Sequence, residues 1–393
     1  MAWDVLSSEQ RELRDLVRQL ARERIAPRAA EIDASHEFPW DIVELFREND
    51  IFGLFFTEEY GGLGTGTLLS LIAIEEVGKV CATSALILAV QELGSLGLKL
   101  AGSDEQKERY LPRLASGEWL PAYALTESGS GSDSAAMRTT ARREGDEYVL
   151  DGSKRFITNA GVANLYTVFA KTDPEAGHDG ISAFVVESDA PGFAVARLEP
   201  KMGISGSTTG ELTFDECRIP AENLLGEEGE GFRIAMRILD RSRPGIAAQA
   251  LGIAQGATDY ALEYAKTRET MGRPIGHHQL IQAKLADMET ECEAARGLLY
   301  RYGRMAEDGV TGPELTKASA MAKLKCGDVA MWVTTEAVQI LGGYGYIKEY
   351  PVERFMRDAK ITQIYEGTQE IQRLVIAREM LKESRAFLLA GVG

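Results

Sequence analysis

The spacing of apolar residues changes twice along this chain of 393 residues, and the changes limit the folds that it can adopt. Over the first 117 residues apolar side chains recur at helical intervals, as Leu13, Leu16 and Leu20 do. Between about 120 and 225, short runs such as "ELTFDECRI" alternate apolar and polar residues and are separated by Gly, Pro and Asp. From about Gly231 long helical patterns return.

This order predicts an α+β protein that is mostly α. A chain of this length exceeds the size of one hydrophobic core, so we expect several domains. They are an N-terminal helical domain at 1–120, a middle antiparallel β domain at 121–228 closed as a β-barrel, and a C-terminal four-helix bundle at 229–393. The bundle is expected from long helical stretches joined by short loops.

Local signals mark several ends of elements. Ser103 precedes Gln106 by three residues, which predicts a capping box at the start of a helix. Asp151-Gly152 stands between two β-like runs and predicts a hairpin turn. Gly342-Gly343 is expected to end a helix. The stretch after it suits either a connector or a segment whose glycines, Gly342, Gly343 and Gly345, let another backbone or a ligand approach closely. A last helix is expected to begin near Thr368.

Charge and cysteine usage exclude several classes of function. The net charge of −17 disfavours nucleic acid and anionic membranes as partners. Four scattered cysteines without a CxxC, and the lack of HExxH, predict no metal site and indicate a reducing compartment. The N-terminus has the pattern of an amphipathic helix and not of a signal peptide, and apolar runs such as "SALILAV" are too short to span a membrane. We expect a soluble, cytoplasmic protein.

The motifs leave the chemistry open when taken singly. No GxGxxG follows a predicted strand and no P-loop is present, so nucleotide-binding folds lose their main support. "YALTESGSGSD" (123–133) suits either a flexible linker or a loop whose N–H groups receive a phosphate. Glu366 in "ITQIYEGTQEIQRL" suits either an acid at the start of a helix or the base of an active site.

Four segments together resemble the acyl-CoA dehydrogenase family. "ALTESGSGSDSAA" (124–136) and "QILGGYGYIKEYPVERFMRD" (339–358) resemble its two sequence signatures. "RETMGRPIGHHQ" (268–279) and "IYEGTQEIQRL" (364–374) resemble two further family segments in the expected places. The similarity covers nearly the whole chain and is greatest to the short- and medium-chain branches.

This resemblance implies a homotetrameric FAD enzyme of fatty-acid β-oxidation. It would oxidise an acyl-CoA to the trans-2-enoyl-CoA and pass electrons to an electron-transfer flavoprotein. Glu366 would remove the α-proton, and N5 of the flavin would accept the β-hydrogen as hydride. Some branches place the base just before an Arg on an earlier helix. Here Ser242 precedes Arg243, and Ser cannot serve as that base.

The resemblance also implies two sets of binding residues. Arg268, Gln279 and residues 339–343 would reach the FAD of a neighbouring subunit. Phe156 stands where many members carry Trp, and Met271 where Phe is common. The full FAD set is Tyr123, Leu125, Thr126, Ser132, Phe156, Ile157, Thr158, Arg268, Thr270, Gln279, Gln339, Leu341, Gly342, Gly343, Thr368 and Glu370. The acyl-CoA set is Ser132, Asp240, Arg241, Ser242, Arg243, Tyr365 and Gly367.

Three alternatives to this function stay open. The substrate could be a branched or carrier-protein-bound acyl thioester, or the enzyme could be an oxygen-reactive acyl-CoA oxidase. A flavin-free scaffold that kept the fold is the third. A decarboxylating glutaryl-CoA activity is disfavoured, because no Arg or Lys occurs between Lys79 and Lys99, where that branch carries an Arg.

Overall fold

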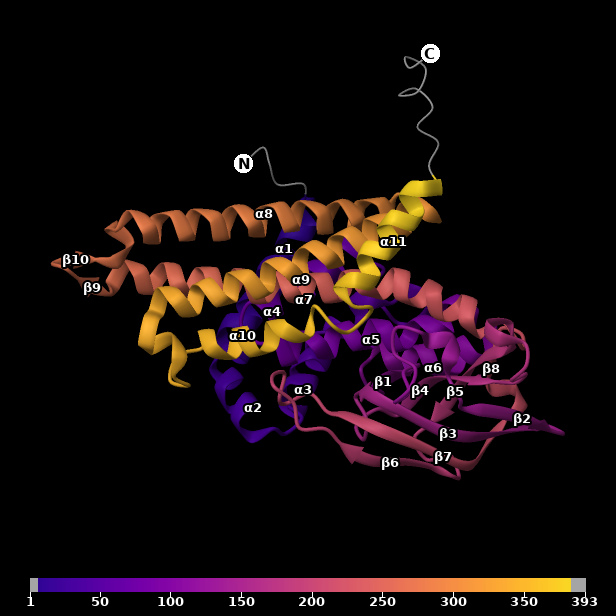
Figure 1. The fold of residues 1–393 in the computed structure, drawn as a ribbon. Coiled ribbons are helices and arrows are strands. Elements are labelled where there is room, and N and C mark those ends of the chain that lie inside the picture. The colour runs from indigo at the N-terminus through magenta and orange to yellow at the C-terminus, as the bar shows by residue number, and fades with distance from the viewer. Residues whose placement is uncertain (1–5, 383–393) are drawn as a thin grey trace, which may run out of the picture.

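The first part of the chain forms helices that pack around an apolar core. The structure is a computed structural model that describes residues 6–382 (Figure 1). The predicted capping box is confirmed, because the Ser103 hydroxyl accepts from the Gln106 N–H and the Gln106 side chain accepts from the Ser103 N–H. The α-helices here are α1 (Ser8–Leu20), α2 (Ala29–Ser35), α3 (Trp40–Glu48), α4 (Thr67–Gly78), α5 (Ala82–Ala101) and α6 (Asp104–Ala115).

Helix α5 lies at the centre of the molecule. Within residues 6–382 it is the one helix whose length and composition would suit a membrane span. However, 78% of its apolar window is buried inside the protein. It packs against α4, α7 and β1, so here it is a core helix.

The middle of the chain forms a mixed sheet. Its strand order is β6-β7-β3-β2-β4-β5-β8, with β1 beside β4. Most pairs are antiparallel, but β1 and β2 run parallel to β4, which differs from the expected wholly antiparallel sheet. The strands are β1 (Pro121–Ala124), β2 (Thr140–Glu144), β3 (Glu147–Thr158), β4 (Leu165–Lys171), β5 (Ile181–Glu187), β6 (Phe193–Leu198), β7 (Thr209–Pro220) and β8 (Leu224–Leu225).

The predicted hairpin turn at Asp151-Gly152 is wrong. Both residues lie inside the continuous strand β3, where the register with β7 shifts between Leu150 and Gly152. A Cβ on Gly152 would lie 2.6 Å from the Thr139 hydroxyl, so the glycine permits a bulge against a neighbouring segment. The hairpin between β2 and β3 instead turns at Gly145, whose φ is 64°.

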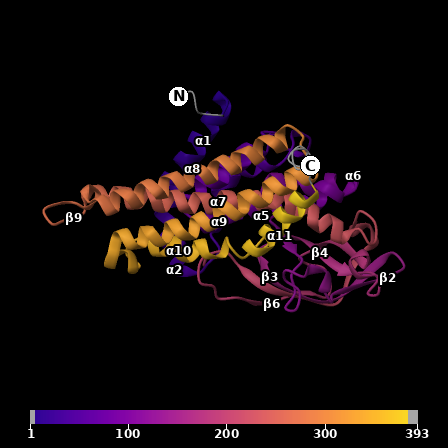
Figure 2. The ribbon, with the colours of Figure 1, turned by 45° about the horizontal axis from the view of Figure 1, so that its top comes forward.

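Long helices form the last part of the chain. They are α7 (Gly231–Thr267), α8 (Gln279–Glu307), α9 (Pro313–Leu341), α10 (Val352–Ile361) and α11 (Gln369–Lys382). Helices α7, α8 and α9 lie side by side in both ribbon views (Figures 1 and 2). Helix α9 ends at Leu341 with Gly342 at a φ of 61°, as predicted. The stretch after Gly342-Gly343, for which a plain connector was one interpretation, contains the helix α10.

Glycines let α7 approach α4 at backbone distance. A Cβ on Gly256 would overlap the carbonyl oxygen of Lys79, and a Cβ on Gly252 would overlap that of Glu75. The small residues of α7 therefore allow the close helix packing that their number predicted. Two helices in such contact cannot accept even a methyl group without moving apart.

We predict that Gly256→Ala destabilises the protein by about 1–3 kcal/mol or more, because the new methyl group meets backbone and not a flexible side chain. Gly245→Ala is the matched control on the same helix, since the nearest atoms to its Cβ would be 3.7 and 3.8 Å away. Chemical denaturation of both variants gives the comparison. An equal or larger loss in Gly245→Ala would contradict the packing argument.

Candidate active site

Glu366 lies on a tight turn between α10 and α11. Its φ is 57° and that of Gly367 is 88°, so two successive residues adopt the left-handed conformation. A non-glycine residue in this region is uncommon and such strain is often kept at functional sites. The turn directs a half-buried carboxylate toward α7.

The Glu366 carboxylate meets polar side chains of α7. The Ser242 hydroxyl donates to its Oε2 at 2.6 Å. Arg243 is 4% exposed and pairs with Asp240 at 2.7 Å. Burial raises the pKa of Glu366, while the Ser242 hydrogen bond and the charges of Arg243 and Lys323 lower it. The group therefore keeps its proton at a pH where an exposed Glu is ionised.

Aliphatic side chains surround the same carboxylate. A small cavity of about 20 Å³ opens beside Glu366, Ser242 and Thr158. The remaining walls come from Leu86, Ala89, Val90 and Leu93 of α5, with Ile246 and Tyr365. The four α5 residues recur at helical spacing and so face one side. This cavity, called the slot below, therefore has mainly apolar walls and a single carboxylate among them.

The polar atoms around this slot suit a bound cofactor with hydroxyl groups. The Tyr123 hydroxyl and the Arg243 Nε, whose residues both interact electrostatically with Glu366, are buried and have no hydrogen-bond partner in the described part of the chain. Burial and the Glu366 charge raise the pKa of Tyr123 well above its usual value, so the phenol stays a neutral donor. Buried donors without partners are rare and indicate that a further molecule supplies acceptors.

The loop after β1 is tied to the sheet and is not a free linker. The buried Glu127 carboxylate accepts from the N–H groups of Arg138 and Thr139 and from Lys154 Nζ at 2.8 Å. Lys154 is fully buried and also donates to the Leu125 carbonyl. This ion pair holds the segment that contains Thr126 and the exposed Ser132.

The end of β3 presents the other predicted flavin contacts on this side. Phe156 has a φ of 59° and is 58% exposed, which is unusual for an aromatic side chain. Thr158 lines the small cavity. Ile157 and Leu125 are buried in the protein core, so their backbone and not their side chains is available to a ligand.

A second group of predicted residues lies at the far end of the bundle (Figure 1). Arg268 and Thr270 lie at the hairpin of β9 (Glu269–Thr270) and β10 (Arg273–Pro274), and Gln279 starts α8. Gln339 and Leu341 end α9, followed by Gly342 and Gly343. Within one chain these residues do not meet Glu366. Leu341 is buried, and the others are exposed.

The remaining predicted residues lie near Glu366 in the sequence or on α7. The Thr368 hydroxyl accepts from the Ile371 N–H at the start of α11, and Glu370 is exposed in its first turn. On α7, Arg241 is exposed whereas Ser242 and Arg243 are buried. The structure thus brings Ser242, Thr158 and Tyr365 to Glu366 and leaves Arg241 toward solvent.

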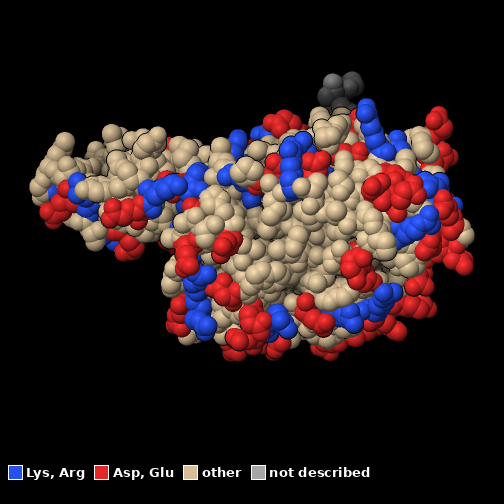
Figure 3. All heavy atoms as spheres, turned by 90° about the horizontal axis from the view of Figure 1, so that it is seen from below, with Lys and Arg blue, Asp and Glu red and all other residues tan. Residues whose placement is uncertain are grey.

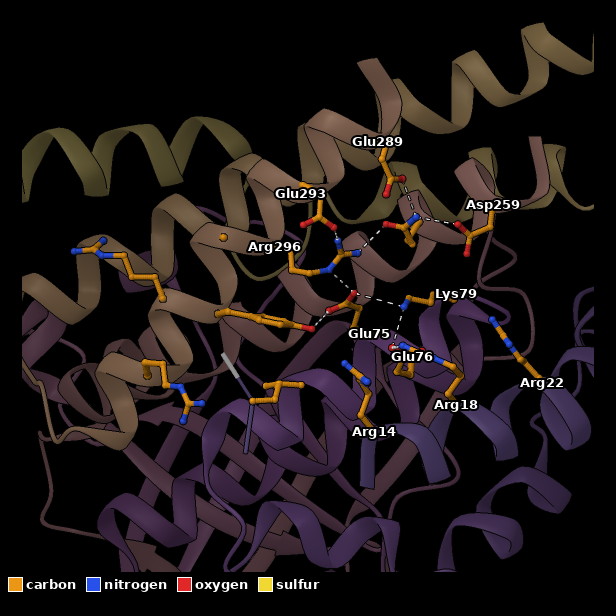
Figure 4. Close-up of a pocket in the computed structure, with 16 residues that line it drawn as sticks. Arg14, Arg18, Arg22, Glu75, Glu76, Lys79, Asp259, Glu289, Glu293 and Arg296 are labelled. Carbon is orange, nitrogen blue, oxygen red and sulfur yellow. Dashed lines mark hydrogen bonds and ion pairs between the residues drawn. The ribbon is translucent and has the colours of Figure 1, made fainter. Parts of the chain in front are cut away.

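A much larger cavity, of about 770 Å³, lies between α1, α4, α7 and α8 (Figure 4). Several of its charged side chains pair with one another, although its lining carries more cations than anions. Arg18 pairs with Glu76 at 2.8 Å, and Arg296 pairs with Glu75 at 3.0 Å. The Tyr300 hydroxyl also donates to Glu75. This is a structural ion-pair network, remote from Glu366, and its size does not make it the active site.

Sequence reasoning missed the walls of the slot and a buried cation. Leu86, Ala89 and Val90 belong to the short apolar run "SALILAV", and their spacing with Leu93 could have predicted one lining face. Lys323 is 1% exposed beneath the Glu366 turn. Nothing in its local sequence distinguishes it from the exposed lysines of a helix.

We predict that Lys154→Met destabilises the protein by about 3–5 kcal/mol, because the buried Glu127 carboxylate loses its cation. Lys266→Met removes a pair with Glu263 in which both side chains are more than half exposed, and should cost less than about 1 kcal/mol. Denaturant unfolding of the two variants tests this. Similar losses would show that the buried pair is not needed to hold the loop.

Comparisons with sequence models of protein families and with curated proteins all indicate the same family. Sequence models of the acyl-CoA dehydrogenase N-terminal, middle and C-terminal domains match residues 7–118, 122–217 and 229–381. A curated relative, cyclohexane-1-carbonyl-CoA dehydrogenase of Geobacter metallireducens, is 50% identical over 96% of this chain and 99% of its own.

Solved structures agree with the sequence comparison. Butyryl-CoA dehydrogenase of Megasphaera elsdenii has a TM-score of 0.93 and 44% identity, over 96% of this chain and 99% of that one. A chain solved in work on the electron transferring flavoprotein of Acidaminococcus fermentans has a TM-score of 0.94 and 45% identity, over 97% and 100%. The chain therefore belongs to the acyl-CoA dehydrogenase family of FAD-dependent oxidoreductases.

Proposed function

We propose that Glu366 is the base that removes the α-proton of a saturated acyl-CoA thioester, which yields the trans-2-enoyl-CoA. The observation that carries this assignment is a single carboxylate, with a raised pKa, among the mainly aliphatic walls of the slot. Among the described residues that line the slot it is the only carboxylic acid. FAD, when bound, supplies the two-electron acceptor for the β-hydrogen.

The residues around Glu366 suit proton abstraction from carbon. The α-proton of a thioester is weakly acidic, so the base must be close, oriented and poorly solvated. The left-handed turn sets the direction of the carboxylate, and Ser242 restricts it by a hydrogen bond. The backbone N–H of Glu366 is the proposed donor to the thioester carbonyl oxygen, where negative charge develops.

The predicted flavin residues of the sheet and of the Glu366 turn would hold FAD at the mouth of the slot. Support comes from the unpartnered Tyr123 hydroxyl, the exposed Phe156 and the loop anchored by Glu127. The aliphatic walls of the slot favour an uncharged acyl chain. Asp240, Arg241, Arg243 and Ser132 would contact the CoA moiety nearer the surface.

The assembly proposed here is a cytoplasmic homotetramer that passes electrons to an electron-transfer flavoprotein. The bundle end projects beyond the rest of the molecule (Figures 1 and 3). Met271, Leu280 and Tyr346 in this part of the chain are exposed apolar residues. Arg268, Gln279 and residues 339–343 lie there, where they would reach the FAD of a neighbour. Light scattering of the purified protein tests the tetramer.

Anaerobic titration with straight-chain acyl-CoAs from C4 to C16 tests the substrate. We expect the flavin band to bleach, fastest with a short chain. Bleaching only with branched or carrier-bound thioesters would move the substrate to that class. Rapid peroxide formation in air would indicate an oxidase. A protein that neither contains nor accepts FAD would exclude the enzyme function.

We predict that Glu366→Gln keeps FAD and the assembly but slows substrate-driven flavin reduction by about 10²–10⁴-fold, the scale of losing a general base. Stopped-flow absorbance under anaerobic conditions measures the rate. Glu48→Gln, which changes an exposed acid on α3, is the control and should reduce at the wild-type rate. Near-normal reduction in Glu366→Gln would remove Glu366 from the mechanism.

The pH dependence of reduction gives a second prediction. Burial raises the pKa of Glu366 above 4.5, so the rate should fall as the pH decreases through that raised value. Ser242→Ala removes a hydrogen bond that stabilises the carboxylate, and should move this acid limb to higher pH. Ser70→Ala, a buried serine bonded to the Leu54 carbonyl, should leave the limb in place. A limb that does not move in Ser242→Ala would contradict the prediction.

A further inference from the structure

A buried lysine lies directly beneath the turn that carries Glu366. Lys323 belongs to α9 and is 1% exposed. Its Nζ donates to the carbonyl oxygen of Gly367 at 2.7 Å and to the Gln369 side-chain oxygen at 3.1 Å. A buried ammonium is costly unless it is paired, and neither of these acceptors is charged. The position therefore needs a reason beyond packing.

Two glutamines complete a clamp around the same turn. The Gln372 side-chain N–H groups donate to the carbonyl oxygens of Glu366 at 3.2 Å and of Gly367 at 2.8 Å. Gln369 donates to the Leu324 carbonyl and to Asp328, which fixes the oxygen that faces Lys323. A side chain on Gly367 would lie 2.7 Å from the Gln372 nitrogen. The clamp thus holds both left-handed residues by their carbonyl groups.

The charged groups that act on Lys323 come from three helices and the turn itself. They are Glu366, Arg243 of α7, Asp328 of α9 and Glu370 of α11. Burial lowers the pKa of Lys323 to about 7, while Glu366 opposes this shift and Arg243 adds to it. Lys323 and Glu366 therefore titrate in mutual dependence. Each ion makes the charged form of the other more stable.

We propose that Lys323 is a positioning residue for Glu366: it fixes the turn through the Gly367 carbonyl, and its positive charge sets the proton affinity of the carboxylate. This inference rests on the proposed role of Glu366 as the base. Lys323 does not reach the slot, whose lining residues do not include it. Its effect is transmitted through the turn and through the charge.

The two effects can be separated by substitution. Lys323→Met removes both the donor and the charge in a side chain of similar length. Lys323→Gln removes the charge but keeps a polar donor, on a shorter side chain. Lys325→Met is the matched control, since Lys325 lies two residues along the same helix, is partly exposed and pairs with Glu291. FAD content and the unfolding midpoint of each holoenzyme show which variants are folded.

The closing experiment titrates Glu366 directly in the substrate-free holoenzyme. Infrared difference spectra give the carbonyl band of the protonated acid, identified by its loss in Glu366→Gln. We expect the midpoint to rise in both Lys323→Met and Lys323→Gln, since an opposite charge nearby lowers the pKa of an acid. Lys325→Met should keep the wild-type midpoint.

Kinetics then test the positioning. At a pH where Glu366 is ionised in every variant, flavin reduction should be at least about tenfold slower in Lys323→Met and less affected in Lys323→Gln. An unchanged midpoint in both Lys323 variants would overturn the inference. If Glu366→Gln reduces normally while the midpoints shift as expected, the base assignment fails and the Lys323–Glu366 coupling stands.

Discussion

The close contact of α7 with its neighbours is the constraint on which the active site depends. One face of this helix meets α4 at backbone distance through Gly252 and Gly256. Further toward its N-terminus it presents Ser242 to the base. The Gln249 side chain lies between these regions and accepts from the Tyr365 hydroxyl. Because one rigid helix carries all these contacts, a shift of α7 against α4 would also displace the partner of Glu366.

The charged groups near α7 that the structure describes leave the Glu366 carboxylate without a direct ion pair. The Glu366 carboxylate is half-buried and has a hydroxyl partner, with Arg243 and Lys323 near but not in contact. Arg243 is itself occupied by Asp240. A direct ion pair would lower the pKa of the acid and make it a weak base, whereas cations at a distance keep it ionisable. The geometry leaves the carboxylate available for a proton from carbon.

Much of the fold could be predicted because its signals are local. The Ser103 capping box and the glycine end of α9 depend on a few neighbouring residues. The predicted hairpin turn at Asp151-Gly152 is wrong because this dipeptide also suits a β-bulge. Only the contact with Thr139, which is distant in the sequence, favours the bulge over the turn. The helix α10 was missed because its charges hide a strongly amphipathic pattern.

The candidate site was predictable only in part. Glu366 could be named through its resemblance to a family segment, and not through its own neighbours. Lys323 and the α5 wall depend on contacts between helices that are far apart in the chain. No local pattern reports which lysine of α9 is buried. Such residues become visible once the packing of the helices is known.

The central position of α4 and α5 also has a consequence for biosynthesis. Nearly every residue of α4 is buried, and α5 is largely apolar, and both bury a large part of these surfaces against α7. On the ribosome, α5 is complete at residue 101 and α7 begins only at residue 231. While the sheet is being synthesised, the nascent chain therefore carries two apolar helices, α4 and α5, and α7 has not yet been made. Contacts between segments so far apart in the sequence form late, and apolar surface left exposed until then favours aggregation.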